Sequence, residues 1–200
     1  MQNLSFDYPQ RPLFSDWSAQ IPPGVTLLCG GESTGKSSLL RLLAAQLPAL
    51  AGHLQINGIS LDEQPDAYRQ QVFWADVHSE AFEQITPAAY FHSRQQLYPH
   101  FDCALLATLT EAFLLTPHMD KAMYMLSTGS KRKVWLAAAF ASGAAVTLLD
   151  EPFAALDKTS VSVLLKLLQE AAAHTERAYV VAHYEALGAT PLASIIDLGS

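Results

Sequence analysis

Apolar and polar residues alternate along two short segments at the start of the chain, Asn3 to Tyr8 and Phe14 to Ile21. A two-residue period predicts strands with one buried face. Pro9 and Pro12 stand between these segments, and proline within sheets is confined mainly to edge strands. We therefore expect two antiparallel strands beside the edge of a sheet.

Farther along the chain, short apolar runs alternate with stretches of helical periodicity. The runs predict strands at Val25 to Cys29, His53 to Ile56, Val72 to Ala75, Val146 to Leu149, Tyr179 to Ala182 and Ser194 to Leu198. The second of these strands is expected to end in a turn at Asn57-Gly58. A leucine pattern predicts a helix after Gly35, and a second helix is expected from Thr159 to His174. Strands that alternate with helices predict an α/β fold with a mostly parallel sheet, whose ligand site lies at the carboxyl ends of the strands.

The stretch from Pro87 to about Ser142 differs because it carries few strand signals. Its apolar residues recur at helical spacing, at Tyr90, Leu97, Leu105, Leu109, Phe113 and Leu126. We interpret this stretch as a helical insertion in a single domain of 200 residues. The expected division is an α/β core at about 1–84 and 145–200 and a helical subdomain at about 85–144.

A glycine-rich loop follows the strand expected at Val25 to Cys29. Its order of glycine, four residues, glycine, lysine and serine is that of a phosphate-binding loop. Such a loop curls its backbone amides round phosphate oxygens, Lys36 reaches the terminal phosphates, and the Ser37 hydroxyl can ligate Mg²⁺. The side chain of Glu32 must point outward, because its carboxylate would repel bound phosphates. The nucleotide-binding residues predicted here are Gly30, Gly31, Glu32, Ser33, Thr34, Gly35, Lys36, Ser37 and Ser38. The alternative is an ordinary glycine turn before a buried helix.

Two carboxylates, Asp150 and Glu151, end the apolar run Val146 to Leu149. In this fold the run ends at the ligand site, where burying two carboxylates without a cation would be costly. We predict that Asp150 holds Mg²⁺, directly or through water, and that Glu151 orients or deprotonates an attacking water. The structural alternative is an acidic turn, or a cap on the next helix.

Further motifs give the chain a resemblance to a known family. Leu126-Ser127-Thr128-Gly129-Ser130 is similar to the signature LSGGQ, and Ala155-Leu156-Asp157 is similar to the D-loop. His183 follows a core strand as the family's switch histidine does, and Tyr8 precedes the glycine-rich loop as its adenine-stacking aromatic does. Together with the phosphate loop and the acidic pair, these motifs resemble the nucleotide-binding domain of the ATP-binding cassette (ABC) family over essentially the whole chain.

The resemblance implies a P-loop NTPase core with an antiparallel N-terminal subdomain and an inserted helical subdomain. It also implies an ATPase whose cofactors are ATP and Mg²⁺ and whose two subunits sandwich two ATP molecules. That cycle would power a separate membrane permease from its cytoplasmic face. Its catalytic residues would be Glu151, His183 and Lys36. Each site would join the phosphate loop, Asp150 and Asp157 with Ser127 and Gly129 of the other subunit.

Each of the added motifs also has a structural explanation. Ser127 and Gly129 can serve as residues that cap a helix. His183 can be a hydrogen-bonded histidine at a strand end, and Tyr8 can pack in the core.

The chain departs from the family pattern in two places. The family usually carries a glutamine after the strand read here as Val72 to Ala75, and it is missing. His78 is its best positional equivalent and a candidate metal ligand, with Asp76 second, but neither reproduces a neutral amide. The signature has Thr128 for its first glycine and Ser130 for its glutamine, so weaker dimer closure is expected.

The charge and the cysteine content bear on which partners the protein can bind and on the compartment in which it works. The 12 basic and 19 acidic residues give a net charge of −7, which disfavours direct binding to nucleic acid. The basic cluster at 131–133 is expected to be a solvated face or a partner contact. Cys29 and Cys103 lie among apolar residues, as expected for reduced core cysteines in the cytosol. The sequence predicts neither a secretory signal nor a membrane span.

Two other functions stay open at this point. One is a regulatory module that dimerises on ATP and hydrolyses it poorly, which the missing glutamine favours. The other is a soluble ABC protein that acts on DNA or ribosomes, although tandem cassettes, coiled coils and basic arms are not evident in the sequence. The short length and the segment LLDEPFAALD are similar to small single-cassette exporter subunits, such as that of the cytochrome c biogenesis haem exporter.

Overall fold

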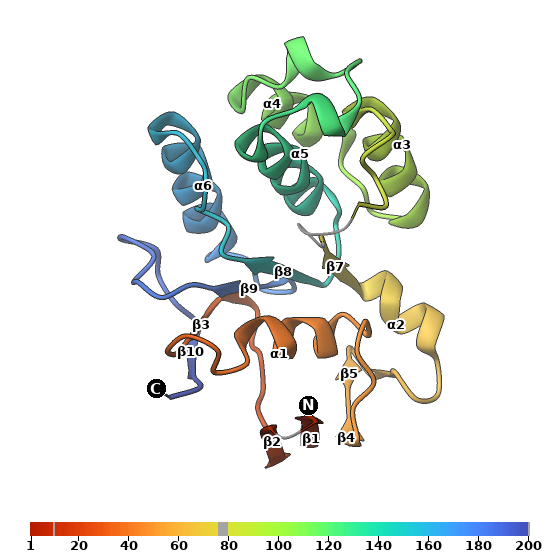
Figure 1. Cartoon of the computed structure of the whole chain (residues 1–200), viewed down its shortest axis with the longest axis vertical. Coiled ribbons are helices and arrows are strands. Elements are labelled where there is room, and N and C mark those ends of the chain that lie inside the picture. The colour runs from red at the N-terminus through yellow and green to blue at the C-terminus, as the bar shows by residue number, and fades with distance from the viewer. Residues whose placement is uncertain (10, 76–79, 200) are drawn as a thin grey trace.

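A parallel sheet of five strands lies at the centre of the computed structural model, which describes residues 1–9, 11–75 and 80–199 (Figure 1). Its strands follow the order β10-β3-β9-β8-β7, and each neighbouring pair is parallel. They are β3 (Gly24–Cys29), β7 (Val72–Trp74), β8 (Val146–Asp150), β9 (Ala178–Ala182) and β10 (Ser194–Asp197). Their carboxyl ends therefore lie along one edge, and the predicted parallel sheet is confirmed.

Helices cover both faces of this sheet, which explains why its central strands are almost continuously apolar. Every residue of β9 is buried, and Val180 and Val181 belong to opposite hydrophobic clusters. Val181 packs in the cluster of α5 (Thr128–Ala141) and α6 (Lys158–Ala171), whereas Val180 packs in that of α1 (Lys36–Leu43). The sheet thus holds its loops between two packed layers.

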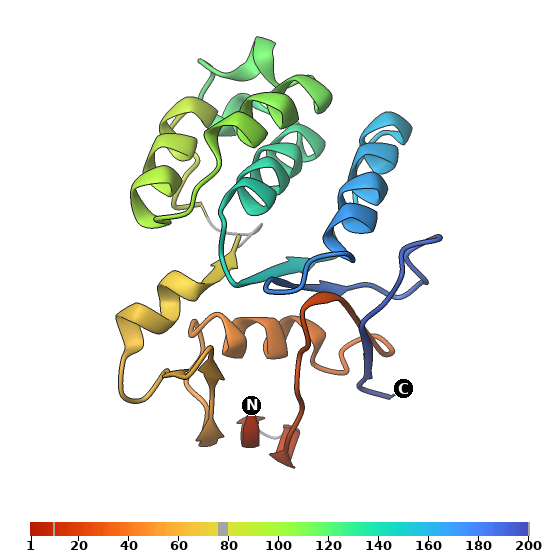
Figure 2. The ribbon, with the colours of Figure 1, turned by 180° about the vertical axis from the view of Figure 1, so that it is seen from behind.

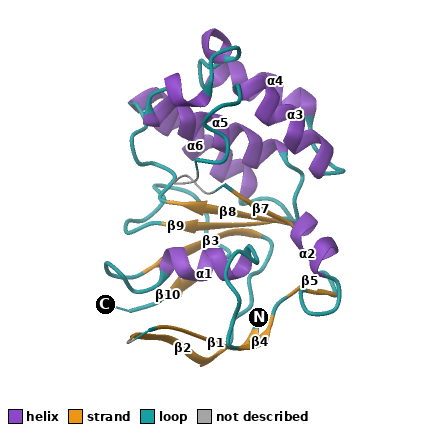
Figure 3. Cartoon of the chain, turned by 45° about the vertical axis from the view of Figure 1, so that its right-hand side comes forward, coloured by secondary structure: helices purple, strands orange, loops and turns teal. Residues whose placement is uncertain are grey.

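A second, antiparallel sheet covers the outer side of α1 (Figure 3). It contains β2 (Arg11–Trp17), β1 (Gln2–Tyr8) and β4 (Ala51–His53), with β1 in the middle. The predicted antiparallel pair is confirmed. However, β2 begins and ends earlier than the predicted segment, because its pairing with β1 runs only from Arg11 to Trp17.

The connection from this sheet back to β7 contains a hairpin and a short helix. Strands β5 (Gln55–Ile56) and β6 (Ile59–Ser60) are joined at the predicted Asn57-Gly58 turn, where both residues have positive φ. Helix α2 (Pro65–Gln71), which the sequence analysis did not predict, has a proline in its first turn and buries Tyr68.

The segment predicted to be helical forms α3 (Pro87–Leu97), α4 (Cys103–Ala112) and α5, which lie together on the side of the sheet away from α1 (Figure 2). Two short 3₁₀ turns, η1 (Thr116–His118) and η2 (Met123–Met125), precede α5. Side-chain oxygens of Thr86, Asp102 and Ser127 cap the three helices. The division of the chain into core and subdomain stays a prediction.

Two further expectations meet the structure here. Cys29 and Cys103 are both free, but Cys103 is exposed, because it occupies the first turn of α4 on its outer side. The expectation that it is a core residue is therefore wrong. Within residues 1–9, 11–75 and 80–199, none of the helices combines the length and the apolar character that crossing a bilayer requires.

The end of α4 offers a matched test of the packing between the helices. Phe113 is fully buried, whereas its neighbour Leu114 is 67% exposed. We expect Phe113→Ala to lower the free energy of unfolding by about 3–5 kcal/mol through lost contacts and a cavity. Leu114→Ala should change it by less than about 0.5 kcal/mol. Urea unfolding followed by circular dichroism measures both, and equal losses would contradict the burial assigned to Phe113.

Candidate functional site

The phosphate loop begins where β3 ends, at Gly30, and α1 begins at Lys36. Gly30 and Gly35 have φ values of 146° and 104°, which favour glycine, and Ser33 also has a positive φ of 59°. The Lys36 ammonium group donates to the Gly30 and Gly31 carbonyls at 2.8 and 2.7 Å. The lysine is thereby held across the loop, where its charge faces the space that the backbone amides surround.

Neighbouring segments hold this loop from two sides. The Gly31 amide donates to the Gly199 carbonyl just after β10 at 2.8 Å, and a Cβ added at Gly30 would lie 3.0 Å from that same oxygen. On the other side, the Arg11 guanidinium on β2 donates to the Ser33 carbonyl at 2.7 Å. The loop is therefore shaped before any phosphate arrives.

Tyr8 lies at the mouth of the loop. Its hydroxyl is 3.3 Å from the Ser38 hydroxyl, its side chain is partly exposed, and a cavity of about 280 Å³ lies between β1, β2 and the start of α1. The ring packs edge-on against Phe6 and leaves part of its surface open. Core packing alone does not explain this position. Glu32 is exposed, which agrees with the outward orientation predicted for it.

The acidic pair and the histidine meet at the carboxyl ends of β8 and β9. The Nδ1 atom of His183 lies 2.7 Å from the Glu151 carboxylate, and the His183 side chain is 10% exposed. The Glu151 amide donates to the Ala182 carbonyl, and the His183 amide donates to the Leu28 carbonyl on β3. Backbone hydrogen bonds thus tie Glu151 to β9, and they tie His183 to β3, the strand that carries the phosphate loop.

Ser37 and Asp150 provide the hard oxygen donors that Mg²⁺ prefers. Within the described part of the chain, neither the Ser37 hydroxyl nor the Asp150 carboxylate has a hydrogen bond, so both oxygens are available to a cation. They fit a Mg²⁺ ion that takes its remaining ligands from phosphate and water. His78 and Asp76, the proposed substitutes for the missing glutamine, lie outside the described residues.

Ser127 and Gly129 lie at the amino end of α5. The Ser127 hydroxyl caps the helix by accepting from the Ser130 amide at 3.1 Å, so the capping explanation holds for it. Gly129 packs directly on the loop after β8, where an added Cβ would collide with the Ala155 carbonyl oxygen. Asp157 caps α6 through the Ser160 amide at 2.9 Å. Asp150 and Glu151 therefore do not have the capping role considered as their alternative.

The basic cluster at the start of α5 contradicts one of the two expectations for it, that of a solvated face. Lys131 binds Glu83 at 2.5 Å, and Lys133 binds Asp157 at 2.6 Å. Arg132 is 8% exposed, and its guanidinium donates to the backbone carbonyls of Asp150 and Glu151. The cluster is therefore no solvated face.

Burial of Arg132 lowers the pKa of its guanidinium, which the nearby acidic pair partly offsets. The sequence carries no local signal for this burial, because it depends on how α5 packs against the loop after β8.

Comparisons with known proteins agree with this geometry. A family model described as ABC transporter matches residues 14–154. The "Cytochrome c biogenesis ATP-binding export protein CcmA" of Rhodospirillum rubrum is 34% identical over 195 residues, which are 92% of this chain and 80% of the relative. The protein of the same name from Pseudomonas savastanoi is 32% identical, over 80% of this chain and 76% of the relative.

Solved structures extend the likeness to the fold. "Structure of ATP binding subunit of ABC transporter" has a TM-score of 0.81 at 23% identity, and covers 91% of this chain and 78% of that one. A putative ABC transporter ATP-binding protein from Pyrococcus furiosus has a TM-score of 0.75 at 22% identity, with coverage of 98% and 95%. At such identities the structures support the mixed α/β architecture alone.

The close approach of Gly129 to the Ala155 carbonyl predicts that Gly129→Ala destabilises the fold, although helix propensity alone predicts that it stabilises the fold. Alanine favours helix over glycine by about 1 kcal/mol. We nevertheless expect Gly129→Ala to lower the free energy of unfolding by about 1–3 kcal/mol, because the added Cβ must displace backbone. Ser130→Ala, on the same turn, removes only the exposed contact between the Ser130 and Ser127 hydroxyls. It should change the free energy of unfolding by less than about 0.5 kcal/mol. Urea titration of both variants tests this, and a stabilised Gly129→Ala would contradict the close approach.

Proposed function

Because this chain belongs to the ABC transporter family, we propose that it is the subunit that binds and hydrolyses ATP to power a separate membrane permease. The observation that carries the proposal is the pairing of Glu151 with His183 beside the strand that bears the phosphate loop. A general base held by a second titratable side chain, next to a phosphate cradle, suits phosphoryl transfer to water.

Nucleotide binding follows from the loop and its surroundings. The amides of 33–38 face the phosphates at the positive end of α1, and Lys36 neutralises charge on the terminal groups. Tyr8 stacks its open face on the adenine ring. Arg11 on the rim adds a second cation, so the local field favours a polyanion although the whole chain carries a charge of −7.

Hydrolysis needs a water activated in line with the terminal phosphorus. Glu151 accepts a proton from that water as its oxygen bonds to phosphorus, and the bond from phosphorus to the bridging oxygen of ADP breaks. The Nδ1–H group of His183 donates to the carboxylate and holds it, which leaves Nε2 of the neutral ring as an acceptor for the attacking water. Ser37 and Asp150 would hold Mg²⁺, which supplies charge neutralisation on the phosphates.

Each complete site would need two chains. Ser127 and the Gly129 amide at the start of α5 would contact the terminal phosphate held by the partner subunit, and Asp157 would lie at the same interface. ATP closes the pair, and hydrolysis with phosphate release opens it. We place the dimer on the cytoplasmic face of a membrane, bound to its permease. The relatives' names describe export, and we extend that direction to this chain.

A purely regulatory role is not favoured. A module that only binds ATP does not need a catalytic carboxylate held 2.7 Å from a histidine. The pair is assembled here from two different strands, which favours turnover over binding alone.

Hydrolysis is tested with a matched pair of glutamate variants. Glu151→Gln should lower Mg²⁺-dependent ATP turnover by at least about 100-fold, because the base is lost, while ATP still binds. The control is Glu185→Gln, whose exposed carboxylate lies two residues after His183 and should leave turnover unchanged. The readouts are phosphate release across a protein concentration series and oligomer mass with and without ATP. Wild-type protein without turnover, or Glu151→Gln with full turnover, would refute the catalytic assignment.

Tyr8 is tested by separating its ring from its hydroxyl. Tyr8→Ala should weaken ATP binding by about 1–3 kcal/mol, the range for one base stacked on an aromatic side chain. Tyr8→Phe keeps the ring and loses only the 3.3 Å contact with Ser38, so its dissociation constant should stay within about twofold of wild type. Titration calorimetry with ATP measures both, and equal effects would exclude stacking.

A further inference from the structure

One helix contacts the loop after β8 at its beginning, its middle and its end. The loop runs from Glu151 to Asp157, and the helix is α5. Arg132 donates to the Glu151 carbonyl, Gly129 packs against the Ala155 carbonyl, and Lys133 binds Asp157. All three contacts come from the first two turns of α5, close to Ser127.

The loop itself has a backbone that needs support. Glu151 and Ala155 have φ values of 43° and 61°, in the left-handed region that residues with a side chain seldom occupy. The contacts from α5 fall on the carbonyls of these same two residues. Helix α5 thus helps to set the orientation of the Glu151 carboxylate.

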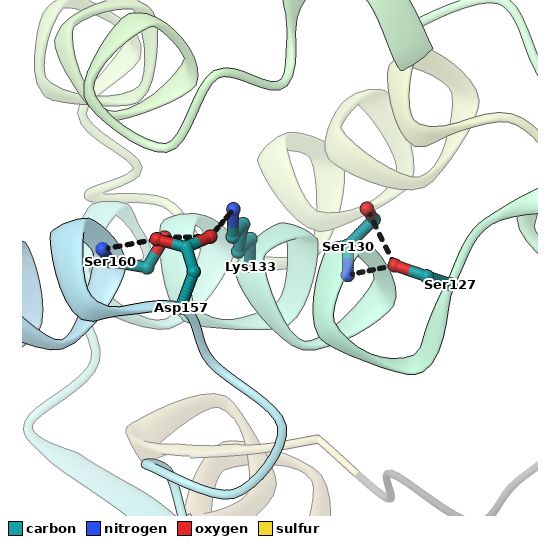
Figure 4. A network of polar contacts seen from close by, with 5 residues as sticks. All are labelled: Ser127, Ser130, Lys133, Asp157 and Ser160. Carbon is teal, nitrogen blue, oxygen red and sulfur yellow. Dashed lines mark hydrogen bonds and ion pairs between the residues drawn. The ribbon is translucent and has the colours of Figure 1, made fainter.

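The third contact fixes the far end of the loop (Figure 4). The Lys133 ammonium lies 2.6 Å from the Asp157 carboxylate, and its side chain is 12% exposed. The same carboxylate accepts from the amide and the hydroxyl of Ser160 at the start of α6. Lys133, followed by Ser160, holds the pKa of Asp157 well below its usual range. The carboxylate therefore stays charged and paired at neutral pH.

We propose that Lys133 is a positioning residue that couples the two ATP sites of the dimer through Asp157. This inference rests on the proposed function, in which Ser127 contacts the partner's ATP while Glu151 acts on the chain's own. When Ser127 engages phosphate, α5 carries the 151–157 loop with it through Lys133 and Arg132. Lys133 therefore acts on the orientation of Glu151 and on dimer closure, and touches neither nucleotide nor water.

Lys133 is the contact best suited to a test, since its side chain lies outside the phosphate loop and the acidic pair. We expect Lys133→Ala to lower kcat by about three- to tenfold and to leave KM for ATP within about twofold. It should also weaken the ATP-dependent dimer in a Glu151→Gln background. Lys133→Arg, which can still bind Asp157, should restore turnover to within about twofold of wild type. The matched control is Lys166→Ala on α6, which removes a lysine from an exposed ion pair with Glu170 and should change neither value.

A double-mutant cycle decides whether Lys133 acts through Asp157. Asp157→Asn keeps an oxygen for the Ser160 amide and loses the charge that Lys133 binds. In that background, Lys133→Ala should have no further effect on kcat. An additive loss would overturn the coupling, as would unchanged kcat and unchanged dimer mass in Lys133→Ala alone.

Wild-type protein in the same series separates this inference from the proposed function. Wild-type turnover together with an unaffected Lys133→Ala would overturn the inference and leave the ATPase assignment standing. If wild-type protein shows neither turnover nor an ATP-dependent dimer, the proposed function fails, and the coupling fails with it.

Discussion

The parallel pairing of β3, β9 and β8 is the constraint on which the rest of the molecule depends. Parallel strands in register bring their carboxyl ends to one edge, so the loops that follow them emerge side by side. Leu28 and Asp150 both lie opposite Ala182, from its two sides. The glycine loop lies more than a hundred residues before the acidic pair and His183 in the sequence, and this register alone brings them together.

Helix α1 has a double role that follows from the same arrangement. Its leucines fill the space between the parallel and the antiparallel sheets, and that burial fixes the position of its amino end. The phosphate loop leads into that end, so the packing of the core determines where the backbone amides point. Arg11 and Gly199 hold the loop's carbonyl and amide groups from outside the helix. A phosphate group can therefore bind with little reorganisation of the loop.

The sequence predicted those parts of the site that are local in the chain. The glycine loop, the parallel strands and the Asn57-Gly58 turn follow from spacing and from residues with special backbone freedom. The contacts that the basic cluster makes could not be predicted in the same way. Whether Arg132 meets solvent or the Glu151 carbonyl depends on how α5 packs against a loop about 20 residues farther on, and periodicity carries no information on that distance. Helix α2 escaped prediction because its seven residues show no apolar period.

A site divided between two chains sets a mechanical requirement on each of them. If the start of α5 serves the partner's phosphate while Glu151 serves the chain's own, events at one site reach the other only through material that connects them. The body of α5 is buried from Val134 to Ala141, so it moves as a rigid element. The loop after β8 is partly exposed and has two residues of positive φ, so it has no such rigidity of its own. In that case its contacts with α5 convert a displacement of the helix into a displacement of the Glu151 carboxylate. The buried Arg132 resists the loss of these contacts, because its charge would lose the carbonyl partners that compensate for burial.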